Sequence, residues 1–110
     1  MITDEFIQKL QRIVGKEQVL ISQADAELYS YDASLAKGKP SVVVFPGDSH
    51  EAAQVVQAAR TAGVTFVPRG FGTNLSGGTV LPAGGLVVCL SRLNRILGMY
   101  PESRYAVVQP

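Results

Sequence analysis

The apolar positions at the start of the chain recur at the spacing of an amphipathic helix. Thr3 stands before two acidic residues and is suited to cap the N-terminus of this helix, and Gly15 is suited to end it. The apolar positions on the shared helical face are Phe6, Ile7, Leu10, Ile13 and Val14. A short apolar piece follows at residues 19–21, and a second, short helix is predicted over residues 22–29. Residues 31–39 are expected to form a loop.

The next pattern is the clearest in the chain and predicts a strand, a helix and a second strand. Residues 42–45 are β-branched and aromatic, which favours a strand. Asp48 is expected to cap the helix, with Glu51 completing a capping box, and Gly63 is expected to end it. The predicted apolar stripe of the helix consists of Ala52, Val55, Val56 and Ala59. Since residues 64–67 form the second strand, the three elements predict a right-handed parallel βαβ unit.

The last part of the chain contains three more apolar stretches of strand length. Residues 86–90 predict a third strand. Residues 105–108 predict a final strand, paired with residues 96–100 across a turn at residues 101–104. The fold class is therefore α/β, or α+β: a small sheet that contains a βαβ unit and carries helices on one face.

The chemistry of the chain is concentrated between the second and third predicted strands. Residues 68–78 read Pro-Arg-Gly-Phe-Gly-Thr-Asn-Leu-Ser-Gly-Gly, with no carboxylate and one positive charge. Glycine allows another group to approach the main chain closely, and successive exposed N–H groups form a concave site for anions. Thr73 and Ser76 add hydroxyl donors, and Arg69 is expected either near phosphate oxygens or facing outward. This stretch therefore predicts a phosphate-binding loop.

The residues that follow the loop exclude two common kinds of phosphate site. An ATP or GTP P-loop requires a Lys and a Ser or Thr after its last glycine, but Gly78 is followed by Thr79 and Val80. The Rossmann fingerprint requires a third glycine where Leu75 stands and a helix where residues 79–90 are not helical. The glycine-rich loop is therefore expected to join two strands.

A strand-linking loop with this arrangement of glycines and hydroxyls resembles the pyrophosphate loop of one flavoprotein family. This family is typified by vanillyl-alcohol oxidase and p-cresol methylhydroxylase (PCMH), and the likeness is greatest to the glycolate oxidase flavin subunit and the FAD-linked D-lactate dehydrogenases. Supporting stretches are Tyr31-Asp32, residues 40–46, the helix with Glu51, Ala58 and Ala59, Gly63, residues 93–96 and residues 107–110. Asn74 departs from the family pattern, in which glycine is frequent, but Asn tolerates a left-handed backbone better than most residues.

The resemblance implies that the chain is the first half of a PCMH-type FAD-binding domain. The implied activity is oxidation of a 2-hydroxy acid, such as glycolate or D-lactate, by hydride transfer to the flavin, with the electrons passed on to an acceptor. Partner subunits belong to the same expectation. The residues that it assigns to FAD are Pro46, Arg69, Gly70, Phe71, Gly72, Thr73, Asn74, Ser76, Gly77 and Gly78. Catalytic residues would lie beyond Pro110, so none is assigned here, and no metal ligand is assigned either.

The composition argues against some classes of partner but does not by itself indicate a function. A net charge of +1 provides no strong field for nucleic acid or an anionic membrane. No window approaches the length of an apolar membrane span and no signal peptide is evident, so a cytoplasmic location is predicted. The single cysteine, Cys89, is expected to be a buried thiol in a strand, and His50 to be a solvated surface residue. Arg92 and Arg95 are also expected to be exposed.

The sequence also predicts how the chain is divided. Residues 1–37 are expected to be a helical leader, and residues 38–110 the N-terminal part of an FAD-binding domain that continues beyond residue 110.

Two alternative functions are retained. One is a cell-wall precursor reductase on the same fold, because such enzymes use a Ser-Asn pair that Thr73-Asn74 partly matches. The other is a stand-alone nucleotide-binding module without catalysis.

Overall fold

The computed structural model describes residues 2–21, 42–71 and 84–110. The predicted short helix over residues 22–29, the loop over residues 31–39 and most of the glycine-rich stretch lie outside the described residues. In chain order the described elements are α1 (Asp4–Val14), η1 (Lys16–Gln18), β1 (Val19–Leu20), β2 (Val42–Val44), α3 (Ser49–Ala62), β3 (Phe66–Arg69), β4 (Leu86–Cys89), β5 (Ile96–Tyr100), η2 (Pro101–Ser103) and β6 (Tyr105–Val108).

Helix α1 begins and ends at the residues that the sequence predicts. The Thr3 hydroxyl accepts a hydrogen bond from the Phe6 amide at 3.2 Å, which satisfies one of the free N–H groups of the first turn. Gly15 ends the helix with a φ of 96°, and its amide donates to the Gln11 carbonyl. Phe6 and Leu10 lie on the buried face, so the predicted apolar stripe is confirmed.

Two side chains, those of Asp48 and Glu51, accept hydrogen bonds from main-chain amides at the N-terminus of helix α3. Asp48 Oδ1 accepts from the Glu51 amide at 2.8 Å, and Glu51 Oε1 accepts from the Gly47 amide at 3.1 Å. The return bond reaches the residue before the cap, so this is a variant of the predicted capping box. Gly63 ends the helix in the left-handed region, with a φ of 68°.

The apolar stripe of α3 differs from the prediction by one position. Val55 and Ala59 are buried as expected and Ala52 is half-buried, but the third buried residue is Ala58, whereas the predicted Val56 is 36% exposed. The sequence contains apolar residues at both positions. Which of the two faces the sheet depends on the rotation of α3 about its own axis when it packs.

The four-stranded sheet has the order β1-β2-β4-β3. Strands β2, β4 and β3 are parallel, and β1 is antiparallel to β2. The predicted β2–α3–β3 unit is therefore present, but β4 lies between its two strands; its right-handed sense stays a prediction. The glycine-rich segment joins two strands, β3 and β4, as expected. Pro68 is compatible with β3 because this strand lies at the edge of the sheet.

Strand β3 begins later than the sequence pattern suggests. The predicted strand covers residues 64–67, whereas β3 starts at Phe66. The Val64 amide donates to the Ala59 carbonyl at 2.9 Å and so completes the C-terminal end of α3. Because that N–H is used by the helix, Val64 contributes a buried side chain but does not take part in the ladder.

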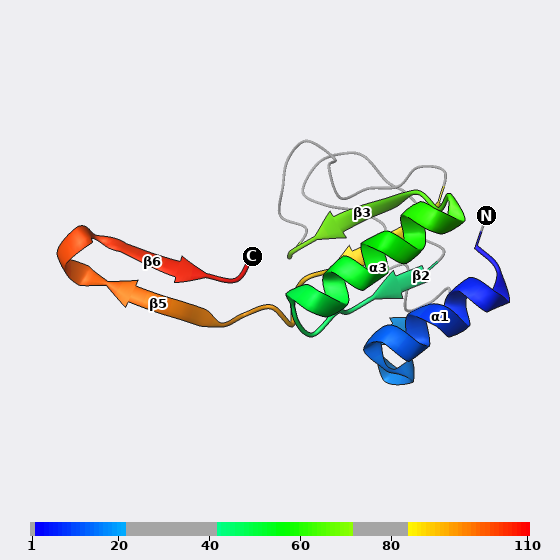
Figure 1. The fold of residues 1–110 in the computed structure, drawn as a ribbon, viewed down its shortest axis with the longest axis horizontal. Helices are drawn as coiled ribbons and strands as arrows, with labels where there is room; N and C mark the ends of the chain where they lie inside the picture. The colour runs from blue at the N-terminus through cyan, green and yellow to red at the C-terminus, as the bar shows by residue number, and fades with distance from the viewer. Residues whose placement is uncertain (1, 22–41, 72–83) are drawn as a thin grey trace.

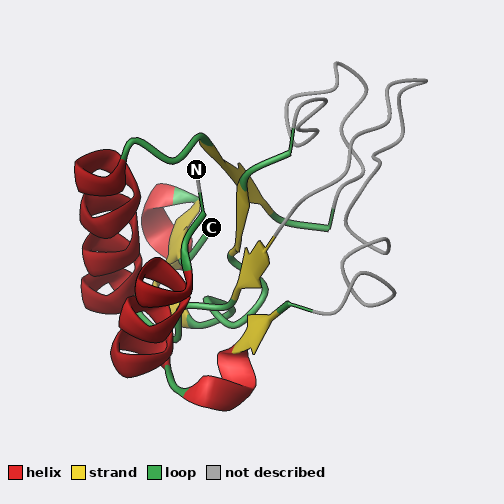
Figure 2. Cartoon of the chain, turned by 90° about the vertical axis from the view of Figure 1, so that its right-hand side faces the viewer, coloured by secondary structure: helices red, strands yellow, loops and turns green. Residues whose placement is uncertain are grey.

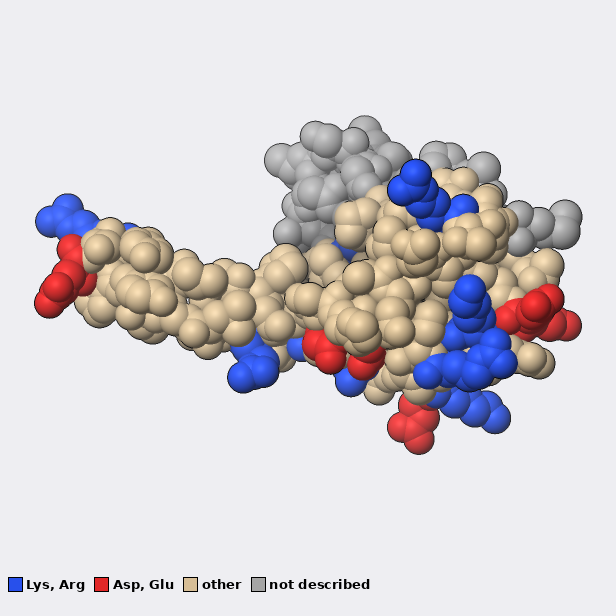
Figure 3. All heavy atoms as spheres, in the orientation of Figure 1, with Lys and Arg blue, Asp and Glu red and all other residues tan. Residues whose placement is uncertain are grey.

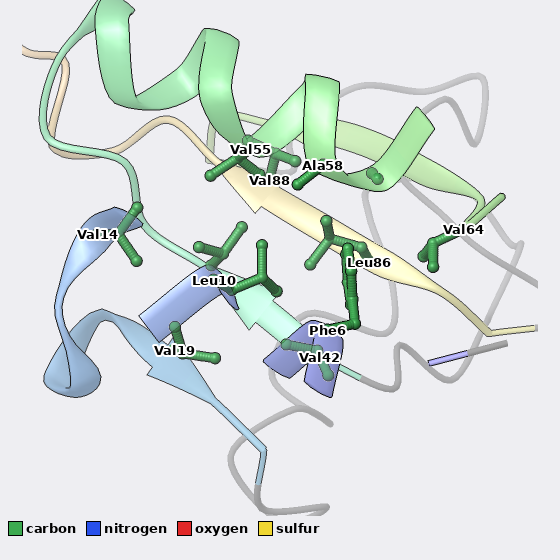
Figure 4. Close-up of a cluster of buried hydrophobic side chains, with 12 residues drawn as sticks. Phe6, Leu10, Val14, Val19, Val42, Val55, Ala58, Val64, Leu86 and Val88 are labelled. Atoms are coloured by element: carbon green, nitrogen blue, oxygen red, sulfur yellow. The ribbon is translucent and has the colours of Figure 1, made fainter. Parts of the chain in front are cut away.

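Helices α1 and α3 pack on the same face of the sheet, as predicted (Figures 1 and 2). Between them and the sheet lies the main core, in which side chains from both helices meet those of β2 and β4 (Figure 4). Its buried members are Phe6, Leu10, Val14, Val19, Val42, Val44, Val55, Ala58, Ala59, Val64, Leu86 and Val88. Residues from both sides of the predicted boundary at residue 38 thus share one core, while the boundary itself lies outside the described residues and stays a prediction.

The opposite face of the sheet is buried as well. Val43, Val87 and Cys89 are at most 2% exposed and form a second cluster with Leu20, Phe45 and Val67. The prediction that Cys89 is a buried strand thiol is confirmed, and its Sγ lies 3.5 Å from the Ser91 hydroxyl. Both faces of strands β2 and β4 are therefore covered, and this agrees with their consecutive apolar residues.

Strands β5 and β6 form a separate antiparallel hairpin that extends away from the rest of the molecule (Figure 1). The turn predicted at residues 101–104 is present as η2, closed by Arg104 with a φ of 60°. The Tyr100 and Tyr105 rings stack next to this turn, with centroids 4.7 Å apart. The pairing predicted from the sequence is confirmed, with a bulge between Ile96 and Gly98.

Candidate functional site

The carboxyl ends of the three parallel strands meet at one edge of the sheet. Val44 pairs with Val88, and Arg69 pairs with Cys89. The residues that leave the sheet at this edge are therefore Phe45 after β2, Gly70 after β3 and Leu90 after β4. Ligands of open parallel sheets bind outside this edge, because loops from several strands converge there. The glycine-rich stretch begins at this edge, and the described chain enters β4 at Leu86, at the opposite ends of the parallel strands.

The first residues of the glycine-rich stretch occupy very different environments. Arg69 is only 6% exposed, which contradicts the outward-facing alternative left open by the sequence. Gly70 is exposed, and a Cβ added to it would meet no atom within 4 Å, so its main chain is open to a ligand. Phe71 is 90% exposed. The remaining predicted FAD residues of this stretch, Gly72, Thr73, Asn74, Ser76, Gly77 and Gly78, lie outside the described residues.

Pro46, the other residue assigned to the cofactor, lies in the bend between β2 and α3 at the same edge. Its side chain is fully buried. Arg92, from the segment after β4, holds this bend: its Nη1 donates to the Phe45 carbonyl at 2.7 Å. The Arg92 guanidinium also lies against Gly47, where an added Cβ would be 2.8 Å from Nη2. Arg92 is exposed, as expected, but the sequence contained no signal for its contact with a residue 47 positions earlier.

A cavity of about 240 Å³ opens beside Gly70 and Phe71. Its other walls come from the segment after β4 and from the two residues after β6, namely Leu90, Ser91, Leu93, Asn94, Gln109 and Pro110. Leu90 is fixed beside Arg69 by a 2.8 Å hydrogen bond from its amide to the Arg69 carbonyl. The sequence-based list of site residues omitted Ser91 and Asn94, although their position just after a predicted parallel strand could have indicated them.

Other candidate groups do not gather into a site. His50 is exposed in the first turn of α3, as expected, and Arg95 is exposed too. In the described ranges 2–21, 42–71 and 84–110 there is no cluster of three or more His, Cys, Asp or Glu residues suited to a metal ion. Within the same part of the chain, no helix has the length and apolar character needed to cross a membrane.

A family model described as "FAD binding domain" matches residues 40–110, so the chain belongs to this family. The solved structure of p-cresol methylhydroxylase has the same fold: it superposes with a TM-score of 0.86 at 21% sequence identity, over 97% of this chain and 22% of that chain. The resemblance to PCMH-type flavoproteins inferred from the sequence is therefore confirmed, and FAD is the cofactor of the family.

Two relatives are named as a glycolate oxidase subunit and a D-lactate dehydrogenase. The chain is 37% identical over its whole length to the glycolate oxidase subunit GlcD of Bacillus subtilis strain 168 and covers 24% of that protein. It is 32% identical over 98% of its length to a D-lactate dehydrogenase of Anaerostipes hadrus and covers 23% of that protein. The chain thus spans about a quarter of the length of the curated relatives that it matches.

The described part of the edge fits an FAD group. FAD combines a doubly charged pyrophosphate with two flat ring systems, so its site needs free main-chain donors beside an apolar surface. Gly70 is exposed, with open space where a side chain would stand, and it lies beside the apolar cavity walls formed by Leu90 and Leu93. No described carboxylate lines this cavity.

Proposed function

We propose that this chain is the FAD-binding part of an oxidoreductase that oxidises a 2-hydroxy acid of the glycolate or D-lactate type. The proposal is supported by the relatives, whose names give glycolate and D-lactate as substrates, both of which carry a hydroxyl next to a carboxylate. FAD, when bound, would accept a hydride from the carbinol carbon of such a substrate. The same proposal includes an acceptor that takes the electrons from the flavin, any partner subunits, and a cytoplasmic location for the protein.

The residues of this chain would bind and orient the cofactor. Main-chain N–H groups from Gly70 to Gly78 would hold the pyrophosphate, and the hydroxyls of Thr73 and Ser76 would add donors. Pro46 would lie near the adenosine part. No catalytic acid or base is assigned to these 110 residues, so they are expected to show no turnover by themselves.

The observation that carries the proposal is where the glycine-rich stretch leaves the sheet. Gly70 follows β3 at the carboxyl edge, beside the segment that follows β4 and next to an apolar cavity. A glycine-rich turn located away from the carboxyl ends of the strands would not lie beside the segment that follows β4 or this cavity. The position therefore favours ligand binding over a turn that only connects two strands.

The experiment that tests cofactor binding is the substitution Gly72→Val in the full-length protein. A valine side chain would crowd the pyrophosphate and resist a positive φ, so the purified variant should lose its bound FAD. Ala62→Val is a matched control, because it adds similar bulk at an exposed position of α3 and should leave the flavin absorbance unchanged. A Gly72→Val protein that remains yellow after purification would count against the proposed phosphate loop.

The substrate class is tested by the reduction of bound flavin in the full-length protein under anaerobic conditions. Bleaching by D-lactate or glycolate supports the proposal, whereas bleaching only by NADPH supports the alternative of a cell-wall precursor reductase. The third reading, a stand-alone nucleotide-binding module, predicts that the reading frame stops directly after Pro110. Several hundred further coding residues would contradict that reading.

A further inference from the structure

The segment between β4 and β5 leaves the sheet at its carboxyl edge and forms one wall of the cavity beside Gly70. The residues of this wall are Leu90, Ser91, Leu93 and Asn94. Arg92, in the middle of the segment, does not line the cavity, and its Nη1 donates to the Phe45 carbonyl at 2.7 Å. The one residue of the run 90–94 that does not line the cavity thus attaches the wall to the end of β2.

The wall is held on both sides of β4, which lies between β2 and β3 in the sheet. Toward β3, the Leu90 amide donates to the Arg69 carbonyl at 2.8 Å. The Leu93 amide donates to the Leu90 carbonyl at 2.9 Å, which closes a four-residue turn, and the Leu93 side chain is buried. Toward β2, Arg92 supplies the contact. The turn is therefore fixed to the ends of both neighbouring parallel strands.

The bend that receives the Arg92 guanidinium is itself fixed. The Phe45 amide donates to the Gln18 carbonyl at 2.9 Å, and the Gly47 amide donates to Glu51 Oε1 at 3.1 Å at the N-terminus of α3. The guanidinium also lies close against this bend, because a Cβ added to Gly47 would be 2.8 Å from Arg92 Nη2. A bond to main chain that is held in place can determine where the cavity wall lies.

We propose that Arg92 is a positioning residue for the cofactor, which fixes the wall formed by residues 90–94 against which FAD binds. This inference rests on the proposed binding of FAD at the carboxyl edge. A wall that is already ordered loses less conformational freedom when the cofactor binds, so the affinity is higher.

Attraction between a positive charge and the anionic pyrophosphate is a different effect and requires a control. Figure 3 shows that positive and negative side chains lie together where the hairpin joins the rest of the molecule. Arg95, three residues further along, is exposed and does not line the cavity. Arg95→Ala therefore removes the same charge from the same segment without breaking the contact with the bend.

The affinity of the full-length apoprotein for FAD, measured by fluorescence titration, tests the proposal. Arg92→Ala should raise the dissociation constant roughly three- to ten-fold, the equivalent of one hydrogen bond. Arg92→Lys should stay within about two-fold of the wild-type value, because an ammonium group also donates to a carbonyl. Arg95→Ala should stay within about two-fold as well, because an exposed charge is screened by solvent.

Gly47→Ala tests the same contact without removing a charge, so the proposal stays falsifiable if Arg92→Ala folds poorly. Gly47 does not have a positive φ, so alanine fits its main chain, but the added methyl group should displace the guanidinium. It should weaken FAD binding in the wild-type background and have no further effect together with Arg92→Ala.

Three results would overturn the proposal: an unchanged affinity in Arg92→Ala, an equal loss in Arg95→Ala, or effects of Arg92→Ala and Gly47→Ala that multiply in the double variant. The second result would show that the charge alone matters, and the third that the two residues act independently. A failure of the proposed phosphate loop would be seen instead as retention of FAD by Gly72→Val, so the two failures are distinguishable.

Discussion

Strands β2 and β4 of the four-stranded sheet and strands β5 and β6 of the hairpin are built from the same kind of sequence but differ in burial. Val42, Val43 and Val44 of β2 are at most 1% exposed, whereas Val107 and Val108 of β6 are 43% and 58% exposed. Both pairs of strands are apolar without alternation, which is typical of strands covered on two faces. The difference shows that a run of apolar residues predicts that a strand requires burial. The elements that bury the strand lie elsewhere in the protein.

The largest expected effect comes from placing a charge in the sheet. Val87→Asp would bury a carboxylate at a position that is 0% exposed, and we expect the 110-residue chain to lose about 4 kcal/mol of stability or to fail to fold. The matched substitution Val107→Asp should change the stability by less than about 0.5 kcal/mol, because this residue is 43% exposed and a carboxylate there remains hydrated. Urea unfolding followed by circular dichroism measures both.

The same pair sharpens the comparison when it is placed in the full-length protein. There the cost of Val107→Asp measures whether further polypeptide covers the hairpin, because a buried carboxylate is strongly destabilising and an exposed one is not. If Val87→Asp and Val107→Asp cost the same in the 110-residue chain, the contrast between the two regions would be wrong.

A second, smaller effect is expected from truncation of the core under α1. Leu10 is fully buried between α1 and the sheet, so Leu10→Ala should destabilise the 110-residue chain by about 3 kcal/mol through lost contacts and a cavity. Leu97→Ala removes the same atoms from a hairpin position that is 58% exposed and should cost less than about 0.5 kcal/mol. Thermal unfolding would contradict the prediction if the two variants had equal midpoints.

Removal of the α3 cap should have a moderate effect. Asp48→Ala deletes the acceptor of the 2.8 Å bond from the Glu51 amide and should cost about 1 kcal/mol. Ser103→Ala in η2 is the control, because η2 has no side-chain cap, and its effect should be within a few tenths of a kcal/mol, roughly the scatter of surface substitutions. An Asp48→Ala variant as stable as Ser103→Ala would exclude a contribution from the cap.

The smallest expected effect concerns the connection between the two regions. Arg92 lies between β4 and the hairpin and is attached to the rest of the molecule by its bond to the Phe45 carbonyl. Arg92→Ala should cost about 0.7 kcal/mol, a value near the low end for hydrogen bonds because the contact is exposed. Arg95→Ala, at another exposed arginine, is the control and should be close to neutral.

A double-mutant cycle distinguishes this contact from a general effect of charge. Gly47→Ala places a methyl group 2.8 Å from Arg92 Nη2 and should displace the guanidinium. Its cost should therefore be present in the wild-type background and absent in the Arg92→Ala background. Equal costs in both backgrounds would show that Gly47 acts independently of Arg92.

The candidate site was predictable from the sequence only in part. The glycines and hydroxyls of residues 68–78 indicate a phosphate loop because such residues free the main chain and add donors, whatever surrounds them. The burial of Arg69, the cavity walls at Ser91 and Asn94, and the contact of Arg92 with Phe45 were not predictable, because each joins segments far apart in the chain. The six predicted site residues between Gly72 and Gly78 stay predictions.

The fold divides in the same way between local and long-range causes. The sequence by itself determined the helix limits at Thr3, Gly15, Asp48 and Gly63, since caps and left-handed glycines act through hydrogen bonds within a few residues. It also determined the pairing of β5 with β6, because their connecting turn is short. Only the tertiary structure decided that β4 lies between β2 and β3 and that Ala58, not Val56, faces the core. Strand order and helix rotation depend on how whole surfaces fit together, and that fit is a property of distant residues rather than of any local pattern.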